Sequence, residues 1–352
     1  MKDFYEYKAF PDAEGQGNNL QSVLDEICSL PEHAHARVQL CEGVYSGQFY
    51  FDGNRLHAGK CGVSLVLEGC GIGKTIITGA LAASEILGDG MKRGTFRTYT
   101  AFFAGPRVEL RNLTIENKAG FQPPEGIGEK AMQAVALYAA AERMFCRKVE
   151  LSGFQDTLFL APLPEEEREV GGFRGPGEAS VRSPTLQLYE NCVVSGSVDF
   201  VFGGAAALFR NCKFIVRNSH SPEKNFYVAA PCSDSPFGDA DCSSGFFFED
   251  SVFMAETAGD SAYLARPWRP FGRCLFYGCS IGKGFSPVMW HVWNSDDDMR
   301  TAGFYSSGMK NESGEALSVK DWGAPLDDDD KKELLDKIKK MIEFEKNYKK
   351  NL

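Results

Sequence analysis

Residues 189–194 read YENCVV, and residues 209–214 read FRNCKF. The same order of residue types returns in LRNLTI from Leu110, in FEDSVF from Phe248 and in FYGCSI from Phe276. Each copy has an aromatic or aliphatic residue, two mostly polar positions, a small or apolar residue, an outward position and an apolar residue. Similarity between short segments of this kind indicates a solenoid, in which each copy stacks on the next.

The spacing of the copies predicts the type of solenoid. Tyr189 and Phe209 are 20 residues apart, Phe209 and Phe248 are 39 apart, and Phe248 and Phe276 are 28 apart. Coils of about twenty-odd residues, interrupted by loops of variable length, give such spacing in a parallel β-helix with strands ~4.8 Å apart. We expect the small positions and the flanking aromatic residues to face inward and to stack with their equivalents in the next coil.

The two ends of the chain are predicted to be helical, in a single domain over residues 1–352. Apolar residues at helical spacing predict a capping helix over residues 20–29, which Pro31 stops. Residues 328–350 have an apolar face and predict a C-terminal amphipathic helix. The acidic run Asp327 to Asp330 is then expected to cap this helix rather than to bind a metal.

The composition excludes several classes of function. A net charge of −10 argues against a nucleic-acid partner, and no apolar run is long enough to span a membrane. The 11 cysteines include no Cys-x-x-Cys pair, so neither a zinc site nor a disulfide framework is indicated. With no secretion signal at the N-terminus, we expect a cytoplasmic protein, or a secreted one if a leader was removed.

The segment LEGCGIGKTIITG, from Leu67 to Gly79, resembles a phosphate-binding loop only in part. The Walker pattern needs a glycine at position 68, where this chain has Glu68. The β-branched residues that follow favour a strand over the required helix. The sequence therefore argues against an NTPase.

Three segments place polar side chains inside otherwise apolar strands, where burial is costly without a partner. These side chains are Gln133 in MQAVALYA, Gln155 and Asp156 in SGFQDTLF, and Asp199 in SGSVDFVFGG. Strand alternation would place Asp199 opposite Phe200 and Phe202. An ionised Asp199 needs a cation, and YLARPWRP offers Arg266, with Trp268 two residues on. Taken alone, Asp199 could equally be a buried, Arg-paired residue that only fixes the strand register.

Together these segments resemble the pectin methylesterase (pectinesterase) family. GFQDTLF and GSVDFVFG resemble its two Asp signatures, YLARPW its Arg-Pro-Trp signature and QAVAL its Gln signature. The resemblance extends over roughly residues 8–325. It implies a right-handed parallel β-helix that hydrolyses the C6 methyl ester of galacturonate units in homogalacturonan or its oligosaccharides, with no metal or cofactor. We also expect a monomer.

The resemblance assigns roles to the polar residues. Asp199 corresponds to the nucleophile, and Arg266 would hold it ionised and aimed. Gln133 and Gln155 would donate hydrogen bonds to the oxyanion of the tetrahedral intermediate. Asp156 would protonate the departing methanol and then act as base on water. By the same resemblance, the substrate-binding residues are Thr100, Phe202 and Trp268.

One segment departs from the family pattern. The 43 positions from Asp156 to Asp199 are about one coil more than the family's usual separation. The excess lies in residues 160–185, which are rich in Gly, Pro and charge and so predict a loop rather than an extra coil. A loop rooted between the two Asp strands is expected to overhang the cleft and to favour short oligomers. Its acidic run could instead be ordinary solvated surface.

Other classes of protein remain as alternatives. A glycosidase needs two carboxylates flanking the glycosidic bond, and the His-Gly and Arg-Ile-Lys signatures of polygalacturonases are absent. A serine esterase would need Gly-x-Ser-x-Gly, which the sequence lacks. A non-catalytic carbohydrate-binding β-helix would keep the core but lose the carboxylates or Gln donors. An esterase acting on another uronate ester is the remaining alternative.

Overall fold

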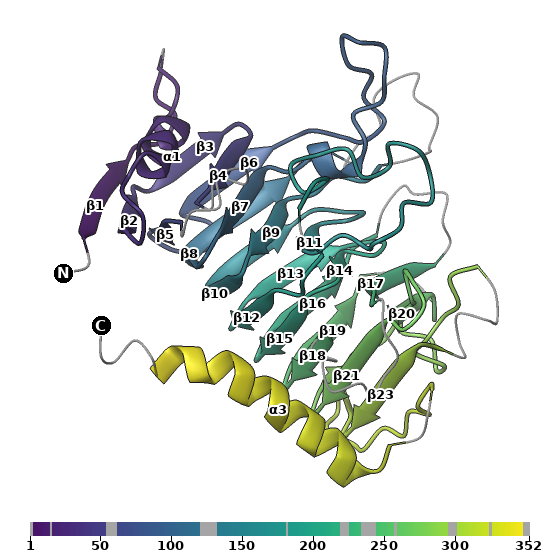
Figure 1. Ribbon diagram of the computed structural model, residues 1–352. Coiled ribbons are helices and arrows are strands. Elements are labelled where there is room, and N and C mark those ends of the chain that lie inside the picture. The colour runs from purple at the N-terminus through teal and green to yellow at the C-terminus, as the bar shows by residue number, and fades with distance from the viewer. Residues whose placement is uncertain are drawn as a thin grey trace.

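The computed structural model describes residues 3–14, 16–53, 62–119, 132–180, 182–218, 225–233, 244–256, 259–294, 301–323 and 326–347. Short strands form three parallel ladders that wind around one apolar core. The fold is therefore the parallel β-helix that the repeats predicted (Figure 1).

The first two ladders are joined, because strands β8 and β10 run through both of them. The first ladder contains β1 (Phe4–Ala9), β2 (His35–Leu40), β5 (Ser64–Glu68), β8 (Val108–Asn117), β10 (Arg143–Ser152), β12 (Leu186–Glu190), β15 (Ala206–Arg210), β18 (Gly245–Glu249), β21 (Arg273–Tyr277) and β23 (Gly303–Ser307). The second ladder contains β3 (Gly43–Ser46), β6 (Thr75–Gly79), the ends of β8 and β10, β13 (Val193–Gly196), β16 (Lys213–Val216), β19 (Val252–Ala255), β22 (Ser280–Ile281) and β24 (Lys310–Asn311).

The third ladder is a separate sheet of seven strands, and it carries the site described below. It contains β4 (Phe49–Asp52), β7 (Ala101–Gly105), β9 (Leu137–Ala141), β11 (Leu158–Leu160), β14 (Val201–Gly203), β17 (Phe226–Pro231) and β20 (Ala262–Ala265).

The six-residue repeat forms the corner between the first and second ladders. Its third residue has a positive φ in every copy, for example 55° at Asn191, 53° at Asn211 and 49° at Asp250. Asn, Asp and Gly adopt this left-handed conformation most easily, which explains why they occupy the third position. The small residue that follows, such as Cys212 or Ser251, is buried as predicted.

The aromatic residues of the repeat stack from coil to coil. Tyr189, Phe209, Phe248 and Phe276 lie in register on neighbouring strands. Their ring centroids are 4.6, 5.0 and 4.5 Å apart along the row, close to the spacing of the strands. The interior of the helix is therefore a column of stacked rings, and the prediction of inward-facing aromatic residues is confirmed.

Helix α1 (Leu20–Cys28) covers the N-terminal end of the solenoid, as predicted (Figure 1). The apolar face of this helix, with Leu20, Leu24 and Ile27, is buried. The side chain of Gln21 donates to the carbonyl oxygen of Tyr50 and accepts from its N–H group, so it satisfies the backbone of edge strand β4. An uncovered edge would be a template for association with another chain.

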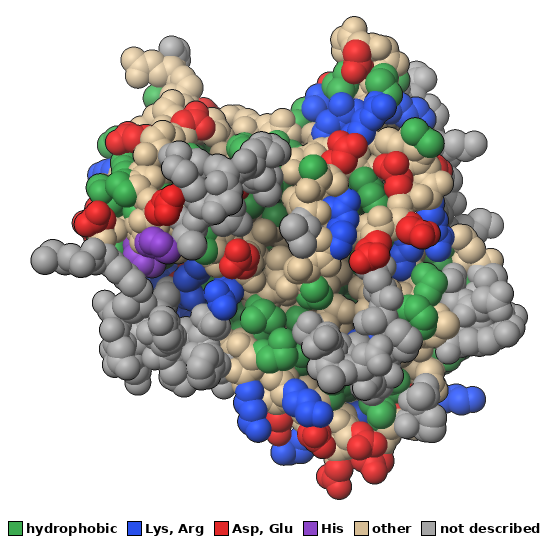
Figure 2. Space-filling view, viewed as in Figure 1, with side chains coloured by type: hydrophobic (Ala, Val, Ile, Leu, Met, Phe, Trp, Pro, Cys, Tyr) green, Lys and Arg blue, Asp and Glu red, His purple; other side chains and the backbone are tan. Residues whose placement is uncertain are grey.

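Helix α3 (Asp328–Asn347) lies across the strands of the first ladder (Figure 1). Leu335, Ile338 and Ile342 pack on outward residues of that ladder. At its start, the N–H of Asp330 donates to the carboxylate of Asp327, so the acidic run caps the helix as expected. The predicted end at residue 350 lies outside the described residues. Figure 2 shows acidic and basic side chains interspersed on the exposed surface of helix α3.

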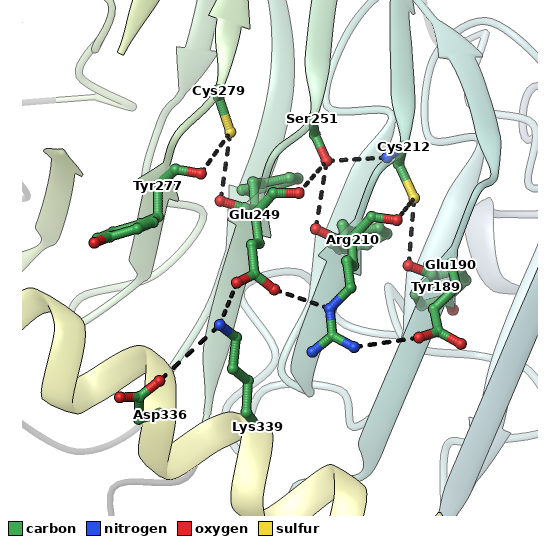
Figure 3. Close-up of polar contacts among 12 residues, drawn as sticks. Tyr189, Glu190, Arg210, Cys212, Glu249, Ser251, Tyr277, Cys279, Asp336 and Lys339 are labelled. Atoms are coloured by element: carbon green, nitrogen blue, oxygen red, sulfur yellow. Dashed lines mark hydrogen bonds and ion pairs between the residues drawn. The ribbon is translucent and has the colours of Figure 1, made fainter. Parts of the chain in front are cut away.

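A row of ion pairs lies beside α3 (Figure 3). Arg210 Nε is 2.9 Å from Glu249 Oε2, and Arg210 Nη1 is 3.3 Å from Glu190 Oε1. Lys339 of the helix pairs with the other oxygen of Glu249. We call Glu190, Arg210, Glu249 and Lys339 the helix-side ion-pair row. It ties α3 to three successive coils.

The segment that resembled a phosphate-binding loop joins two strands. A turn connects β5, which ends at Glu68, to β6, which begins at Thr75. No helix follows the glycines, so the argument against an NTPase is confirmed. Within the described residues, no helix is long and apolar enough to cross a membrane.

Candidate active site

The predicted catalytic residues lie around the strands of the third ladder. Gln133 precedes β9, Gln155 and Asp156 precede β11, Asp199 precedes β14 and Arg266 follows β20. Leu158 pairs with Val201, so Asp156 and Asp199 hold equivalent positions in neighbouring coils. The N–H of Asp156 donates to Val198 O at 3.0 Å, which fixes the two coils to each other at the site.

Both aspartates have left-handed backbone conformations, with φ of 64° at Asp156 and 49° at Asp199. Asp tolerates this region better than most residues, and such conformations cluster at functional sites. Gly196 allows the turn before Asp199, because a Cβ atom there would lie 2.2 Å from Phe200 Cβ.

The predicted alternation around Asp199 is wrong. Strand β13 ends at Gly196 and β14 begins at Val201, so residues 197–200 form a turn and not a strand. As a result Phe200 points into the core, whereas Phe202 belongs to the aromatic cluster outside the third ladder.

Arg266 holds Asp199 through two parallel hydrogen bonds. Nε donates to Oδ1 at 2.8 Å, and Nη2 donates to Oδ2 at 2.6 Å. The side chains are 12% and 6% exposed, respectively. A bidentate guanidinium contact at a buried position fixes the orientation of the carboxylate.

Two aromatic rings hold Arg266 in turn. Its guanidinium carbon lies 3.8 Å from the ring centroid of Tyr227 and 4.3 Å from that of Trp293. Cations bind favourably over aromatic faces at such distances. Sequence reasoning missed both residues, since neither interrupts an apolar strand with a polar group.

The site opens into a cavity of about 460 Å³. The five predicted catalytic residues, Gln133, Gln155, Asp156, Asp199 and Arg266, all line it. Phe202 and Trp268 also line it, with their ring centroids 5.6 Å apart and their rings edge to face. The structure therefore brings together seven of the eight residues named from the sequence.

Thr100 is the residue that the structure does not bring into the cavity. Its side chain is buried, and its hydroxyl donates to Glu116 O at 2.9 Å. The assignment of Thr100 as a substrate contact is therefore not supported. A structural hydrogen bond between neighbouring coils accounts for a Thr at this position.

The loop predicted over residues 160–185 corresponds to residues 161–180 and 182–185, which lie outside the strands, between β11 and β12. Strand β11 pairs directly with β14, so Asp156 and Asp199 are separated by one coil whose extra residues leave the solenoid. Glu167, Arg168, Glu169, Gly172 and Phe173 of this loop line the catalytic cavity. The loop therefore forms part of the wall of this cavity.

The inserted loop is held by specific contacts. The carboxylate of Glu167 accepts from the N–H groups of Phe173, at 2.7 Å, and Gly171, at 3.0 Å, and these bonds lower the pKa of Glu167. Phe173 packs edge to face on Phe96 with centroids 5.9 Å apart. Gly175 lets the loop backbone come so near Phe96 that a Cβ atom would lie 2.7 Å from its carbonyl oxygen.

A search of the described residues finds no group of three or more His, Cys, Asp or Glu side chains that could hold a metal ion. Besides Arg266, the predicted catalytic residues supply a fixed carboxylate, a second carboxylate one coil away and two amide side chains. This set can support nucleophilic attack, proton transfer and stabilisation of an oxyanion.

These features define a β-helix protein with a carboxylate-based site on one face. Comparison with known families gives the narrower class, because the family model described as Pectinesterase matches residues 11–163 and 181–324. The chain belongs to the pectinesterase family. The gap between the two matched ranges, residues 164–180, lies within the inserted loop.

Curated relatives agree with the family assignment. A probable pectinesterase/pectinesterase inhibitor of Arabidopsis thaliana is 30% identical over 70% of this chain and 37% of its own length. A pectinesterase of Petunia integrifolia is 29% identical over 87% of this chain and 70% of its own length. The chain spans less than half of the length of most of these relatives, such as 46% of a second Arabidopsis protein.

Solved structures share the fold. The pectin methylesterase from carrot has a TM-score of 0.67 at 20% identity, covering 93% of this chain and 89% of the carrot chain. The pectin methylesterase from Erwinia chrysanthemi has a TM-score of 0.65 at 20% identity, covering 95% of both chains.

The expected cytoplasmic location is wrong. The pectinesterase family match and the plant relatives, such as pectinesterase 1 of Citrus sinensis, point to secretion. The cysteines do not indicate a compartment either. Cys146, Cys192, Cys212 and Cys279 are buried inside the solenoid, so their use reflects packing and not the compartment.

Proposed function

We propose that this protein is a pectinesterase that removes the C6 methyl ester from galacturonate units and releases methanol. The observation that carries the proposal is the Asp199–Arg266 pair, which opens into a cavity that Gln133, Gln155 and Asp156 also line. The proposed enzyme works as a monomer, and one chain supplies every residue of this site.

Asp199 is the proposed nucleophile. Arg266 donates a hydrogen bond to each carboxylate oxygen of Asp199 and aims it, and Tyr227 and Trp293 keep Arg266 in place. An oxygen of Asp199 attacks the ester carbonyl carbon and forms a tetrahedral intermediate. The amide N–H groups of Gln133 and Gln155 stabilise its negative oxygen, and one such donor typically contributes ~10²–10³-fold in rate.

Asp156 is the proposed acid and base. As the intermediate collapses, the C–O bond to the methoxy group breaks and Asp156 gives its proton to the leaving methanol. The product is an anhydride between Asp199 and the galacturonate carbonyl. Asp156, now ionised, takes a proton from water, the hydroxide attacks the anhydride, and Asp199 leaves as a free carboxylate.

The substrate is proposed to be methyl-esterified homogalacturonan or its oligosaccharides. A related solved structure, at a TM-score of 0.65, is a pectin methylesterase in complex with a hexasaccharide. In this chain Phe202 and Trp268 offer aromatic faces to sugar rings in the cavity. The inserted loop narrows the cavity and is proposed to favour short oligomers over long polymers.

The test is methanol release from highly methylated pectin and from methylated trigalacturonide, with Asp199→Ala beside the parent. The proposal predicts release by the parent and none by the variant, with the same circular dichroism for both. A folded parent that releases no methanol from either substrate would exclude this activity. It would leave binding without turnover or another uronate ester as the function.

The same experiment tests the role of the inserted loop. If the loop favours short oligomers, kcat/KM per ester is higher on the trimer than on the polymer. Equal values on the two substrates would show that the loop does not select for length. A variant in which Phe173 is changed to Gly should move the ratio toward equality, because it removes the ring that packs on Phe96.

A further inference from the structure

A second cavity lies on the other side of the inserted loop. Its volume is about 340 Å³, within the range of roughly 300–1,000 Å³ of ligand pockets. Its floor includes Ala104 of β7 and Ala140 of β9, and its loop side includes Gly177, Ser180 and Ser183.

An aromatic partition separates the two cavities. Phe96 and Phe173 line the catalytic cavity, whereas Tyr138 lines the second one. Phe96 is 5.9 Å from Phe173 and 6.2 Å from Tyr138, edge to face in both cases. The loop backbone contacts this partition at Gly177. It lies so close to Tyr138 that a Cβ atom there would be 1.9 Å from the Tyr138 hydroxyl. The second cavity is therefore a compartment of its own on the same face.

The sequence of the strands explains the open space. Phe102 of β7 is in register with Tyr138 of β9, and these large rings form the wall. Two residues further along each strand, Ala104 is in register with Ala140. Since alternate residues of a strand share a face, two small side chains stand beside two large ones and leave a hollow.

The charges of the two cavities differ. The catalytic cavity is lined by three cations, Arg168, Arg266 and Arg269, together with the carboxylates of Asp156, Glu167, Glu169 and Asp199. Among the described residues that line the second cavity there is no Lys or Arg, and Glu142 is the one carboxylate. Arg182 of the inserted loop is not among these lining residues. Its guanidinium donates hydrogen bonds to the loop backbone, at the carbonyl oxygens of residues 177, 178 and 180.

We propose that the second cavity binds a methyl-esterified galacturonate unit and rejects the free acid. The apolar floor suits the C–H face of the sugar and the ester methyl group, and the hydroxyls of Ser180 and Ser183 suit its polar edge. A free carboxylate would meet the Glu142 carboxylate, and none of the described residues that line the cavity is a Lys or Arg that could bind it. This assignment rests on the proposed function, because the ligand is a unit of the proposed substrate.

The experiment measures binding by calorimetry in an Asp199→Asn background, so that turnover does not interfere. Ala140→Phe fills the second cavity and is expected to weaken binding of methylated trigalacturonide about tenfold or more. Val252→Phe is the matched control, because it adds the same ring to a half-exposed position of β19 in the second ladder. It should bind the trimer as the background does.

A second variant tests the charge argument without filling the cavity. Glu142 is exposed, so Glu142→Lys should fold normally. It is expected to improve binding of unesterified trigalacturonide about tenfold. Parent-like binding of the methylated trimer by Ala140→Phe, or no gain for the free acid in Glu142→Lys, would overturn the assignment.

The outcome can be separated from that of the proposed function. If the parent releases no methanol but Ala140→Phe weakens binding, the esterase proposal fails and the second cavity still binds the esterified unit. If the parent releases methanol and Ala140→Phe binds normally, the esterase proposal stands and the cavity assignment fails.

Discussion

Two clusters of paired carboxylates and cations lie on different faces of the solenoid, and burial alone does not tell them apart. Asp199 in the site is 6% exposed, and Glu249 in the helix-side ion-pair row is 10% exposed. Glu249 has a different cation on each oxygen, Arg210 on one and Lys339 on the other, so it links helix α3 to a strand. Asp199 has both oxygens on Arg266 and opens into a cavity.

The comparison shows what separates a structural ion pair from a candidate catalytic one. In the helix-side ion-pair row, each ion pair links two neighbouring strands or links a strand to helix α3 (Figure 3). In the site, Arg266 orients Asp199, aromatic rings orient Arg266, and the free space beside the carboxylate can admit a substrate. Substitutions in the site should therefore change the rate, and substitutions in the row should change stability.

Apart from changes at Asp199 itself, the largest effect is expected at Asp156. Asp156→Asn removes the proposed proton donor and base, so kcat for methanol release should fall by about 10²–10⁴-fold. Asp250→Asn is the matched control, since Asp250 also has a positive φ but lies at a corner between the first and second ladders. A near-parental rate for Asp156→Asn would show that another group moves the proton.

A smaller loss is expected when the support of Arg266 is removed. Tyr227→Leu removes an aromatic face 3.8 Å from the guanidinium, a contact worth about 0.5–2 kcal/mol, so kcat should fall by about 2–30-fold. Tyr227→Phe keeps the face and should retain most of the rate. Equal losses in the two variants would mean that the hydroxyl, and not the ring, supports the site.

The helix-side row should respond in the opposite way. Arg210→Met leaves Glu190 and Glu249 without their shared cation and should lower the free energy of unfolding by about 1–3 kcal/mol. Methanol release at 25 °C should stay within about twofold of the parent, because the change lies on another face. Denaturant unfolding and a rate assay on the same sample check both statements.

The smallest effect is expected in the inserted loop at low pH. Its N–H bonds lower the pKa of Glu167 from the ordinary value of 4.5. A lowered pKa in the folded state means that the contact stabilises the loop above pH 4.5 and is lost as the pH falls below the folded value. Limited proteolysis should cut the loop faster as the pH falls in that range, and Glu167→Gln should remove this pH dependence.

The repeats and polar signatures were enough to predict the solenoid, the two terminal helices and the polar side chains that meet at one cavity. The corner conformation could not be predicted, because the residue pattern shows which types recur but not their φ angles. The turn at residues 197–200 was missed for the same reason. The apolar residues of this segment are typical of a strand. The turn depends on the positive φ of Asp199 and on the close approach of Gly196 to Phe200, and neither can be inferred from residue types.

The rest of the site depends on contacts between distant segments. Trp293 reaches Arg266 from a loop beyond the last strand of the third ladder, and Phe173 reaches Phe96 from the inserted loop. Neither has a local signal, since an aromatic residue in a sequence with many aromatics is by default part of the core. Thr100 is the reverse case, because the resemblance implied a substrate contact, whereas in the structure its hydroxyl donates to a backbone oxygen, Glu116 O.

The most direct test of the central claim compares Asp199→Asn with Arg210→Met in one experiment, measuring methanol release and the free energy of unfolding for both. The account predicts that the first variant loses activity by about 10⁴-fold or more and remains folded, while the second loses stability and keeps its rate. If Asp199→Asn released methanol at a rate near that of Arg210→Met, Asp199 would be another structural ion pair, and the proposed mechanism would be wrong.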